Sequence, residues 1–385
     1  MSAPAAVSGL PALRVRRALA AMRAAQLDGL IVYSRGHITQ YGAVEFLTGY
    51  TPVARPAYAV LTTAGDTVFV APTPADRFFA SRLPGAPRVL LAGQGDVVSG
   101  SDDLAGTAAS ALLADGGTPR RVGVSGMRTM LPAGELDALR AALPGVELVD
   151  ADALLAAVKA VKDERELAEL AATAEIADAG FFAARRALRA GASDAEVGAA
   201  IRAEIFARGC RDALVFVSAE PFFLCFSQGR RFRDGDLVTI YVEVVGPSGY
   251  WVEVGGLLAL GEPPAEQLRV AEAALRAAAE MEKLLLPGQT AGAVARVADE
   301  LAARERLHSG LWHGHGVGVD HDGPVITASD ATELRAGMVL AVHPNYSTAD
   351  ERFGASVVDT YAIGPDGPRR LSAIPQEILS VGGGA

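Results

Sequence analysis

The chain has 385 residues, of which 50% are hydrophobic and 21% are charged. This composition is typical of a folded globular protein, and the length suits two domains better than one. The formal charge of −10 disfavours nucleic acid as a partner, because the phosphate backbone is itself negative. No apolar run reaches the ~18 residues that a membrane span needs, and the first residues lack the order of a signal peptide. We therefore expect a cytoplasmic protein with no membrane and no nucleic-acid partner.

The first part of the sequence, residues 1–155, has the pattern of an α/β domain. Apolar residues at helical spacing predict a helix over 13–27. Short apolar runs predict strands over 30–33, 57–61, 67–70, 89–91, 122–124 and 146–149. Helical segments between such strands favour a mixed sheet with helices packed on its faces.

The second part, residues 156–385, has the pattern of an α+β domain. A helix is expected over 163–189, and a capping-box sequence at 193–196 begins another helix that ends at Gly209. Strands over 237–245 and 250–258 flank a Gly-Pro-Ser-Gly turn and predict a hairpin. Helices over 264–285 and 290–305 follow, and then strands over 316–320, 339–343 and 357–363.

Short motifs occur in the second part in a definite order. They are Gly-Asp at 235–236, Gly-Tyr at 249–250, Gly-His-Gly-Val-Gly at 314–318, His-Asp-Gly-Pro at 321–324 and His-Pro-Asn-Tyr at 343–346. This order resembles that of the pita-bread family, which includes methionine and Xaa-Pro aminopeptidases, prolidase, creatinase and ectoine hydrolase. The first part, with Phe-Leu-Thr-Gly-Tyr at 46–50, resembles the ribonuclease-H-like N-terminal domain of the creatinase and prolidase branch. The resemblance implies a creatinase-type N-terminal domain and a pita-bread catalytic domain.

The resemblance also implies where metal ligands would stand. The aminopeptidases of the family hold two metal ions with two Asp, one His and two Glu. The matching positions of this chain are Val242 or Glu243, then Glu253, His315, His343 and Val358. Only His315 is of the expected type, and valine cannot coordinate a metal, so we do not expect a two-metal peptidase. A single ion held by Glu253, His315 and His343 stays open, since three nitrogen or oxygen ligands suit an open metal site.

The metal-free branch of the family is the better match. Creatinase and ectoine hydrolase resemble this chain in lacking those ligands, and the resemblance implies acid–base catalysis without a metal or another cofactor. In that branch a histidine shortly before the Gly-Asp pair transfers a proton, and Cys225 stands at that position here. Cys225 is either a nucleophile beside an imidazole or a buried, inert residue of the apolar segment 222–226.

Four of the six histidines lie between residues 308 and 321. His313 and His315 are two residues apart, so they would point to the same face of a strand. Imidazole suits proton transfer near neutral pH, and a nearby carboxylate orients it. We therefore predict catalytic roles for a set of imidazoles and hairpin carboxylates: His315, His321, His343, Glu243 and Glu253. His308 and His37 are expected to have no special role.

Substrate contacts are predicted from the same resemblance. Arg55 matches a region from which creatinase sends an arginine into the pocket of the partner subunit, and its guanidinium would suit a substrate carboxylate; the alternative is an ordinary surface arginine. The remaining predicted contacts are Tyr250, Trp251, Phe223 and His313. Because the family usually forms dimers, we also expect a homodimer.

The expected activity is metal-independent hydrolysis of a C–N bond in a small, amino-acid-like molecule, by histidine and glutamate acid–base catalysis. The candidate substrates are amidine, guanidino, cyclic amidine and amide compounds. Three alternatives stay open: a lyase, isomerase or cyclase that uses the same pocket, an aminopeptidase-like enzyme with one metal ion, and a non-catalytic binding protein.

Overall fold

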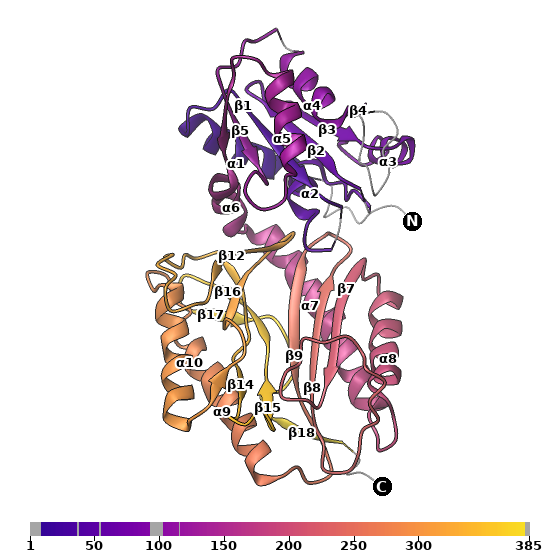
Figure 1. Cartoon of the computed structure of the whole chain (residues 1–385), viewed down its shortest axis with the longest axis vertical. Helices are drawn as coiled ribbons and strands as arrows, with labels where there is room; N and C mark the ends of the chain where they lie inside the picture. Colours follow the sequence, from indigo (N-terminus) through magenta and orange to yellow (C-terminus); the bar gives the residue numbers. More distant parts are fainter. Residues whose placement is uncertain (1–8, 37, 54, 93–102, 115, 382–385) are drawn as a thin grey trace. The chain divides into compact units, whose positions relative to one another are not determined.

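The chain folds into two compact units, residues 1–159 and 160–385. The structure is a computed structural model that describes residues 9–36, 38–53, 55–92, 103–114 and 116–381. His37 therefore lies outside the described residues. Figure 1 shows the elements of each unit in sequence colours.

The N-terminal unit is built around one six-stranded sheet with the strand order β4-β3-β2-β1-β5-β6. Its strands are β1 (Gly29–Ser34), β2 (Ala57–Thr62), β3 (Thr67–Ala71), β4 (Arg88–Leu91), β5 (Arg121–Ser125) and β6 (Glu147–Asp150). Its helices are α1 (Leu10–Ala24), α2 (Gly42–Thr48), α3 (Pro74–Ala80), α4 (Leu104–Leu113), α5 (Ala133–Ala142) and α6 (Asp152–Ala160).

Helices cover both faces of this sheet. The burial of its central strand, β1, along the whole length of the strand shows this. Ile31 and Tyr33 pack in a cluster with residues of α4 and α5. Their neighbours in β1 point to the opposite face, since side chains alternate along a strand, and those neighbours are buried as well. The sheet is mixed, with antiparallel β1–β2 and β2–β3 pairs and parallel β1–β5, β5–β6 and β3–β4 pairs. The predicted α/β class is confirmed.

The described residues of the C-terminal unit form three sheets and two helix pairs. Its helices are α7 (Glu164–Ala187), α8 (Asp194–Ala207), α9 (Ala265–Glu282) and α10 (Ala291–Glu305). Its first strands are β7 (Asp212–Ser218), β8 (Leu237–Val245), β9 (Trp251–Leu260), β10 (His308–Ser309), β11 (Gly314–Val317) and β12 (His321–Val325). The remaining strands are β13 (Val339–Val342), β14 (Asn345–Ser347), β15 (Gly354–Ser356), β16 (Asp359–Ile363), β17 (Pro368–Arg370) and β18 (Ile378–Val381).

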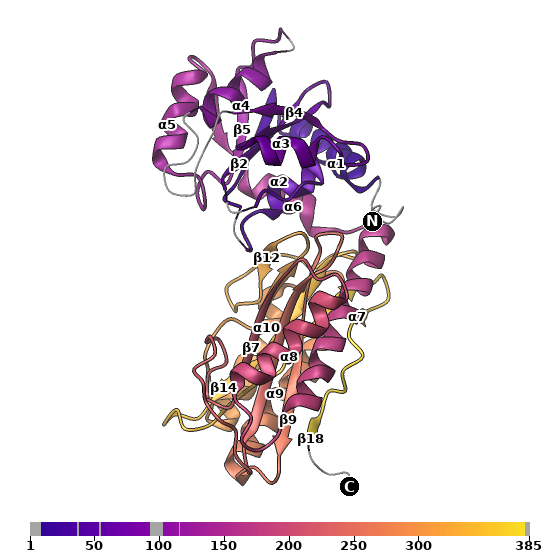
Figure 2. The same ribbon diagram turned by 90° about the vertical axis from the view of Figure 1, so that its right-hand side faces the viewer.

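The two larger sheets have the strand orders β18-β9-β8-β7 and β12-β11-β13-β16-β17, and a small sheet has the order β10-β14-β15. Helices α7 and α8 pack together against β7, β8 and β9, whereas α9 packs on α10 and against β14 and β15. Figure 2 shows α7 and α8 side by side along the β7–β9 sheet. The helix pairs thus cover the sheets from outside, and this is the predicted pita-bread architecture.

Element boundaries differ from the predicted ones where backbone conformation overrides the residue pattern. Helix α1 ends at Ala24 rather than 27, because Gln26 has φ 53° and cannot continue a right-handed helix. The strand expected over 316–320 begins and ends earlier, because β11 covers Gly314–Val317 and residues 318–320 form the turn to its antiparallel neighbour β12.

Candidate metal centre

Two buried glutamates face each other in the β8–β9 hairpin. Glu243 and Glu253 are direct cross-strand partners, and their exposed fractions are 5% and 0%. Carboxylates placed directly opposite each other repel, and burial increases that cost because water no longer screens the charges. The hairpin therefore needs positive charge, a proton or a cation beside these two side chains.

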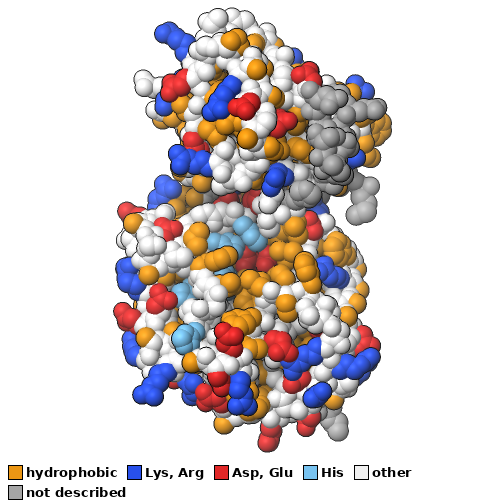
Figure 3. Space-filling model, in the orientation of Figure 1, with side chains coloured by type: hydrophobic (Ala, Val, Ile, Leu, Met, Phe, Trp, Pro, Cys, Tyr) orange, Lys and Arg blue, Asp and Glu red, His pale blue; other side chains and the backbone are white. Residues whose placement is uncertain are grey.

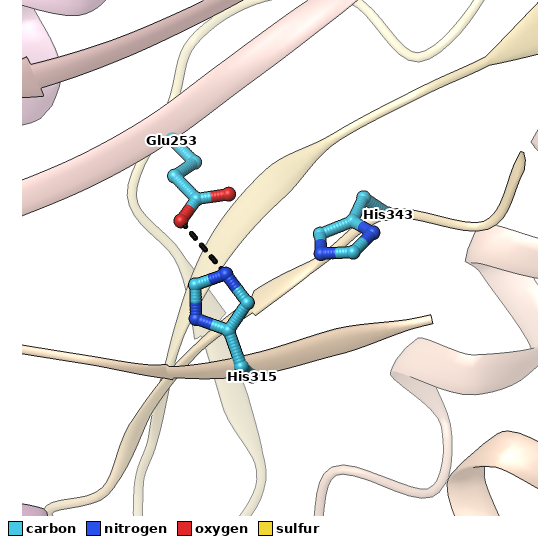
Figure 4. Close-up of side chains that lie close together, drawn as sticks. All are labelled: Glu253, His315 and His343. Atoms are coloured by element: carbon cyan, nitrogen blue, oxygen red, sulfur yellow. Dashed lines mark ion pairs between the residues drawn. The ribbon is translucent and has the colours of Figure 1, made fainter. Parts of the chain in front are cut away.

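Two histidines reach Glu253 from the other large sheet. His315 lies on β11, and its Nε2 atom is 3.1 Å from Oε1 of Glu253. His343 follows directly after β13, which pairs with β11. One ligand atom from each of Glu253, His315 and His343 lies within 4.8 Å of the others. Figure 4 shows the three side chains converging from three segments of the chain.

A second trio shares Glu253. His321, the first residue of β12, places its Nε2 atom 3.2 Å from Oε2 of Glu243 and 3.5 Å from Oε1 of Glu253. The indole ring of Trp251 packs edge-on against this imidazole, with ring centroids 4.9 Å apart. His321 thus bridges the two carboxylates, and Trp251 fixes the plane of its ring.

Burial and the neighbouring charges shift the pKa values of the residues in the cluster, some upward and some downward. Burial and the neighbouring Glu253 raise the pKa of Glu243. Burial acts to raise the pKa of Glu253 too, but the imidazoles of His315 and His321 outweigh it and hold this pKa below its usual range. Burial lowers the pKa of His343 to about 3. For His321 burial acts to lower the pKa, and the two carboxylates outweigh it and raise the pKa to about 9. Glu253 is therefore ionised, and His343 is a neutral imidazole.

The first trio fits one divalent metal ion. Oε1 of Glu253 and Nδ1 of His343 are buried and have no hydrogen-bond partner among the described residues. Nitrogen and oxygen ligands about 2.0–2.2 Å from a zinc ion lie roughly 3–3.5 Å from one another, and the contact between His315 and Glu253 falls in that range. A carboxylate and two imidazoles are ligand types that zinc and iron accept. Glu253, His315 and His343 are therefore the residues that would hold the ion.

Two of the positions considered for family ligands carry valine, Val242 and Val358. Val358 is buried in an apolar cluster with Phe216, Phe223 and Tyr241. Val242, one of the two residues considered for the first aspartate position, lies on the other face of β8, next to Gly180 of α7. Strand alternation places Glu243 and Tyr241, rather than Val242, on the face that carries Glu253.

Sequence reasoning missed Tyr241. The phenol Oη donates a hydrogen bond to Oε2 of Glu253 at 2.5 Å, and the side chain is buried. An aromatic residue in a strand is ordinarily core, so residue type alone gives no signal. The available signal was the two-residue spacing from Glu243, which puts both side chains on the same face of β8.

The other predicted site residues have different surroundings. Cys225 is half-buried in the segment between β7 and β8, and among the described residues its sulfur makes no hydrogen bond with an imidazole. The hydroxyl of Tyr250 donates a hydrogen bond to Oε1 of Glu166 on α7 at 2.6 Å. Arg55 is half-buried in the N-terminal unit, and its predicted role in a partner's pocket stays a prediction.

The two histidines of the His-x-His pair have separate partners. Nε2 of His313 lies 2.9 Å from Oδ1 of Asp299 on α10, whereas His315 contacts Glu253. The structure therefore does not bring His313 into the cluster. His308 is exposed on the short strand β10.

Two segments with exposed apolar side chains contact the cluster or its neighbour Tyr241, through Trp312 beside His343 and Phe223 on Tyr241. Phe222, Leu224 and Trp312 are each almost half exposed, and the Trp312 ring lies 6.5 Å from the ring of His343, centroid to centroid. A cavity of about 40 Å³ is lined by residues of the same segments, among them Phe222, Phe223 and Leu311. Figure 3 shows histidine and acidic side chains gathered on one face of the C-terminal unit with hydrophobic side chains beside them.

Comparisons with known proteins agree with this architecture. The family model described as metallopeptidase family M24 matches residues 168–365, and the creatinase/prolidase N-terminal domain model matches residues 14–161. An Xaa-Pro dipeptidase of Pyrococcus horikoshii is 26% identical over 262 residues, which are 66% of this chain and 74% of that protein. An uncharacterized hydrolase/peptidase, y4tL, of Sinorhizobium fredii is 23% identical over 380 residues, 92% of this chain and 93% of that one.

Solved structures give the same result. The dipeptidase PepE of Mycobacterium ulcerans is 26% identical, with a TM-score of 0.79 over 97% of this chain and 98% of that one. The prolidase of Pyrococcus horikoshii OT3, 20% identical, shares the fold with a TM-score of 0.79 over 95% of this chain and 100% of that one. Among the described residues, no helix combines the length and apolarity needed to cross a lipid bilayer.

These comparisons contradict the prediction of a metal-independent C–N hydrolase of the creatinase kind. The matching family model describes metallopeptidases, and relatives are named dipeptidases. The prediction failed because it compared the family's ligand positions with this chain one residue at a time. The fold instead brings one glutamate and two histidines together at one place. The chain belongs to metallopeptidase family M24, and its catalytic domain follows an N-terminal domain of the creatinase/prolidase type.

Proposed function

We propose that this protein is a hydrolase of small peptides, similar to the dipeptidases among its relatives, that works with a single divalent metal ion. The convergence of Glu253, His315 and His343 carries this proposal, since three buried ligand atoms lie within 4.8 Å of one another. A carboxylate and two histidines are also the ligand set of several zinc peptidases. An ion held there supplies Lewis acidity toward the oxygen of a substrate carbonyl.

The second trio supports a proton-transfer role for His321. Its Nε2 atom lies 3.2 Å from Glu243, a carboxylate that is not part of the proposed ligand set. A carboxylate beside an imidazole orients the ring and stabilises its protonated form. Hydrolysis of a peptide bond requires a proton for the departing amine nitrogen, and we assign its delivery to Nε2 of His321. Glu243 and Trp251 hold that ring in place.

The apolar surroundings favour a peptide with an apolar side chain. Trp312 exposes apolar surface beside His343, and Phe222 and Leu224 do so on either side of Phe223, whose ring stacks on Tyr241. Burial of such surface stabilises a bound ligand by roughly 25 cal/mol per Å² of apolar area removed from water. A small apolar dipeptide, including one with proline in second place as in the relatives' names, is therefore the first substrate class to test.

Metal analysis combined with a dipeptide panel tests the proposal. We expect protein purified without chelators, or reloaded with Zn²⁺, Mn²⁺ or Co²⁺, to hold one ion per chain and to hydrolyse apolar dipeptides. Glu253→Gln and His343→Ala should each remove the ion and lower kcat/KM by about a hundredfold or more. His308→Ala, at an exposed position on β10, is the matched histidine control and should change neither readout.

Two results would contradict this function. One is a folded wild-type protein that takes up no divalent ion from any of the three salts. The other is full dipeptide turnover by Glu253→Gln after exhaustive chelation, because hydrolysis would then proceed without the proposed ligand.

A further inference from the structure

The two oxygens of Glu253 have different surroundings. Oε2 accepts the hydrogen bond from Tyr241 at 2.5 Å. Oε1 is 3.1 Å from Nε2 of His315 and 3.5 Å from Nε2 of His321, and it has no hydrogen-bond partner among the described residues. One oxygen is thus occupied by a fixed donor, and the other is directed toward the imidazoles.

Tyr241 cannot easily move away from this bond. The Phe223 ring stacks on its ring with centroids 4.6 Å apart and planes 12° apart. Phe216 packs edge-on against it at 6.2 Å, and Val358 belongs to the same buried cluster. Close-packed interiors leave little room for a ring to change rotamer, so the phenol stays beside Glu253.

The backbone of Glu253 is held as firmly as its side chain. Its N–H donates to Oγ1 of Thr360 at 3.0 Å, and the same hydroxyl donates to its carbonyl oxygen at 2.8 Å. Thr360 lies on β16, in the sheet that also contributes His315. The carboxylate is therefore fixed at both ends relative to the strand that carries its imidazole partner.

We propose that Tyr241 is a positioning residue that occupies Oε2 of Glu253 and thereby presents Oε1 to the metal ion. The Tyr241 hydroxyl binds Oε2, whereas the contacts of Glu253 with His315 and His321 are both made by Oε1. This inference rests on the proposed function, because it concerns the same metal ion.

Cobalt binding to the full-length Tyr241→Phe variant tests the inference. The variant keeps the aromatic ring and removes only the hydroxyl. Partners that hydrogen-bond to a metal ligand are typically worth 10–100-fold in metal affinity, so we expect Co²⁺ affinity to fall by that factor. The visible Co²⁺ spectrum should also weaken and shift, since the released Oε2 can join the coordination.

Tyr58→Phe is the matched control. Tyr58 is a fully buried tyrosine of β2 in the N-terminal unit, and it donates to Oε2 of Glu135 at 3.0 Å. Each variant loses one hydrogen bond from a buried tyrosine to a glutamate, so both should lose thermal stability without metal. Only Tyr241→Phe should alter Co²⁺ affinity and spectrum.

The outcomes separate the two proposals. A wild-type protein that binds one Co²⁺ while Tyr241→Phe keeps the same affinity and spectrum overturns the positioning role and leaves the proposed function standing. A Tyr241→Phe protein that binds Co²⁺ 10–100-fold more weakly and with a changed spectrum supports the positioning role. A folded wild-type protein that binds no Co²⁺ overturns the proposed function and the positioning role together, and the wild-type titration alone shows that result.

Discussion

At the scale of single residues, the site depends on the small number of polar groups that contact the buried carboxylate of Glu253. Glu253 is fully buried and ionised because imidazoles and the Tyr241 hydroxyl take the place of water. Removal of one such partner leaves a buried charge unpaired, which is far more costly than loss of the same bond at the surface. Conservative substitutions around Glu253 should therefore have large effects.

Asp359 gives a pH prediction at this scale. Burial, only partly opposed by Arg370 3.1 Å away, raises the pKa of this carboxyl to about 7. The folded state thus binds a proton that the unfolded state has released, and stability falls as pH rises from about 4 to about 7, by at most about 1.4 kcal/mol per pH unit. Above that window the contribution is constant.

The variant Asp359→Asn should lack this dependence. Urea unfolding of both proteins between pH 5 and 8 should show wild type losing stability relative to the variant as pH rises to about 7. Carboxyl groups common to the two proteins cancel in the difference. A difference that stays flat across this range would mean that Asp359 is ionised throughout.

The two cysteines give a second residue-scale prediction. Cys210 is buried, and burial raises the pKa of its thiol to about 11, so it should resist iodoacetamide at pH 8, whereas the half-buried Cys225 should react. Peptide mass spectrometry before and after unfolding distinguishes them. Cys225→Ser should keep at least roughly half of the dipeptide turnover, since surface substitutions usually have small effects; a hundredfold loss would restore the nucleophile hypothesis.

At the scale of elements, the close packing of strand β9 near Glu253 depends on Gly255, which has no side chain. A methyl group on Gly255 would lie 2.2 Å from the backbone oxygen of Ile240 and 2.8 Å from Val358. Backbone cannot yield as a flexible side chain does, so Gly255→Ala should destabilise the protein by about 1–3 kcal/mol. Because Glu253 is two residues away, the same variant should bind Co²⁺ more weakly.

Gly198→Ala is the control for that prediction. Gly198 lies inside helix α8, and a methyl group there meets nothing within 4 Å. Replacement of glycine by alanine in a helix interior should stabilise the protein by about 0.5–1 kcal/mol. Thermal unfolding that ranks the two variants in the opposite order would show that β9 has room to move.

At the scale of the whole molecule, the residues of the candidate centre all belong to the unit of residues 160–385. The resemblance to creatinase predicts that Arg55 of the N-terminal unit serves the pocket of a partner chain, and a homodimer is expected on the same ground. Light scattering should therefore give about twice the chain mass of 39.7 kDa.

Subunit mixing tests the role of Arg55. Chains with Arg55→Ala and chains with Glu253→Gln should each be nearly inactive alone. A mixed dimer then has one pocket with both native residues, so unfolding and refolding the two chains together should restore roughly a quarter of wild-type turnover, by random pairing of chains. No recovery from a correctly refolded dimer would show that Arg55 acts within its own chain, and full turnover by Arg55→Ala alone would show that it has no role.

The sequence by itself determined the fold family. Hydrophobic periodicity and glycine turns are local signals, and the β8–β9 hairpin with its two glutamates follows from alternation and one turn. The segments with His315 and His321 stand out by their density of histidines, and the segment with His343 by the resemblance of its motif to the pita-bread family.

Only the tertiary structure decided which of these side chains meet. His315 and His343 reach Glu253 through pairing of strands distant in sequence, whereas the adjacent His313 binds α10. The role of Tyr241 depends on one hydroxyl placed beside one carboxylate oxygen. A metal site is defined by distances among a few atoms from separate segments, and residue types compared one position at a time do not contain those distances.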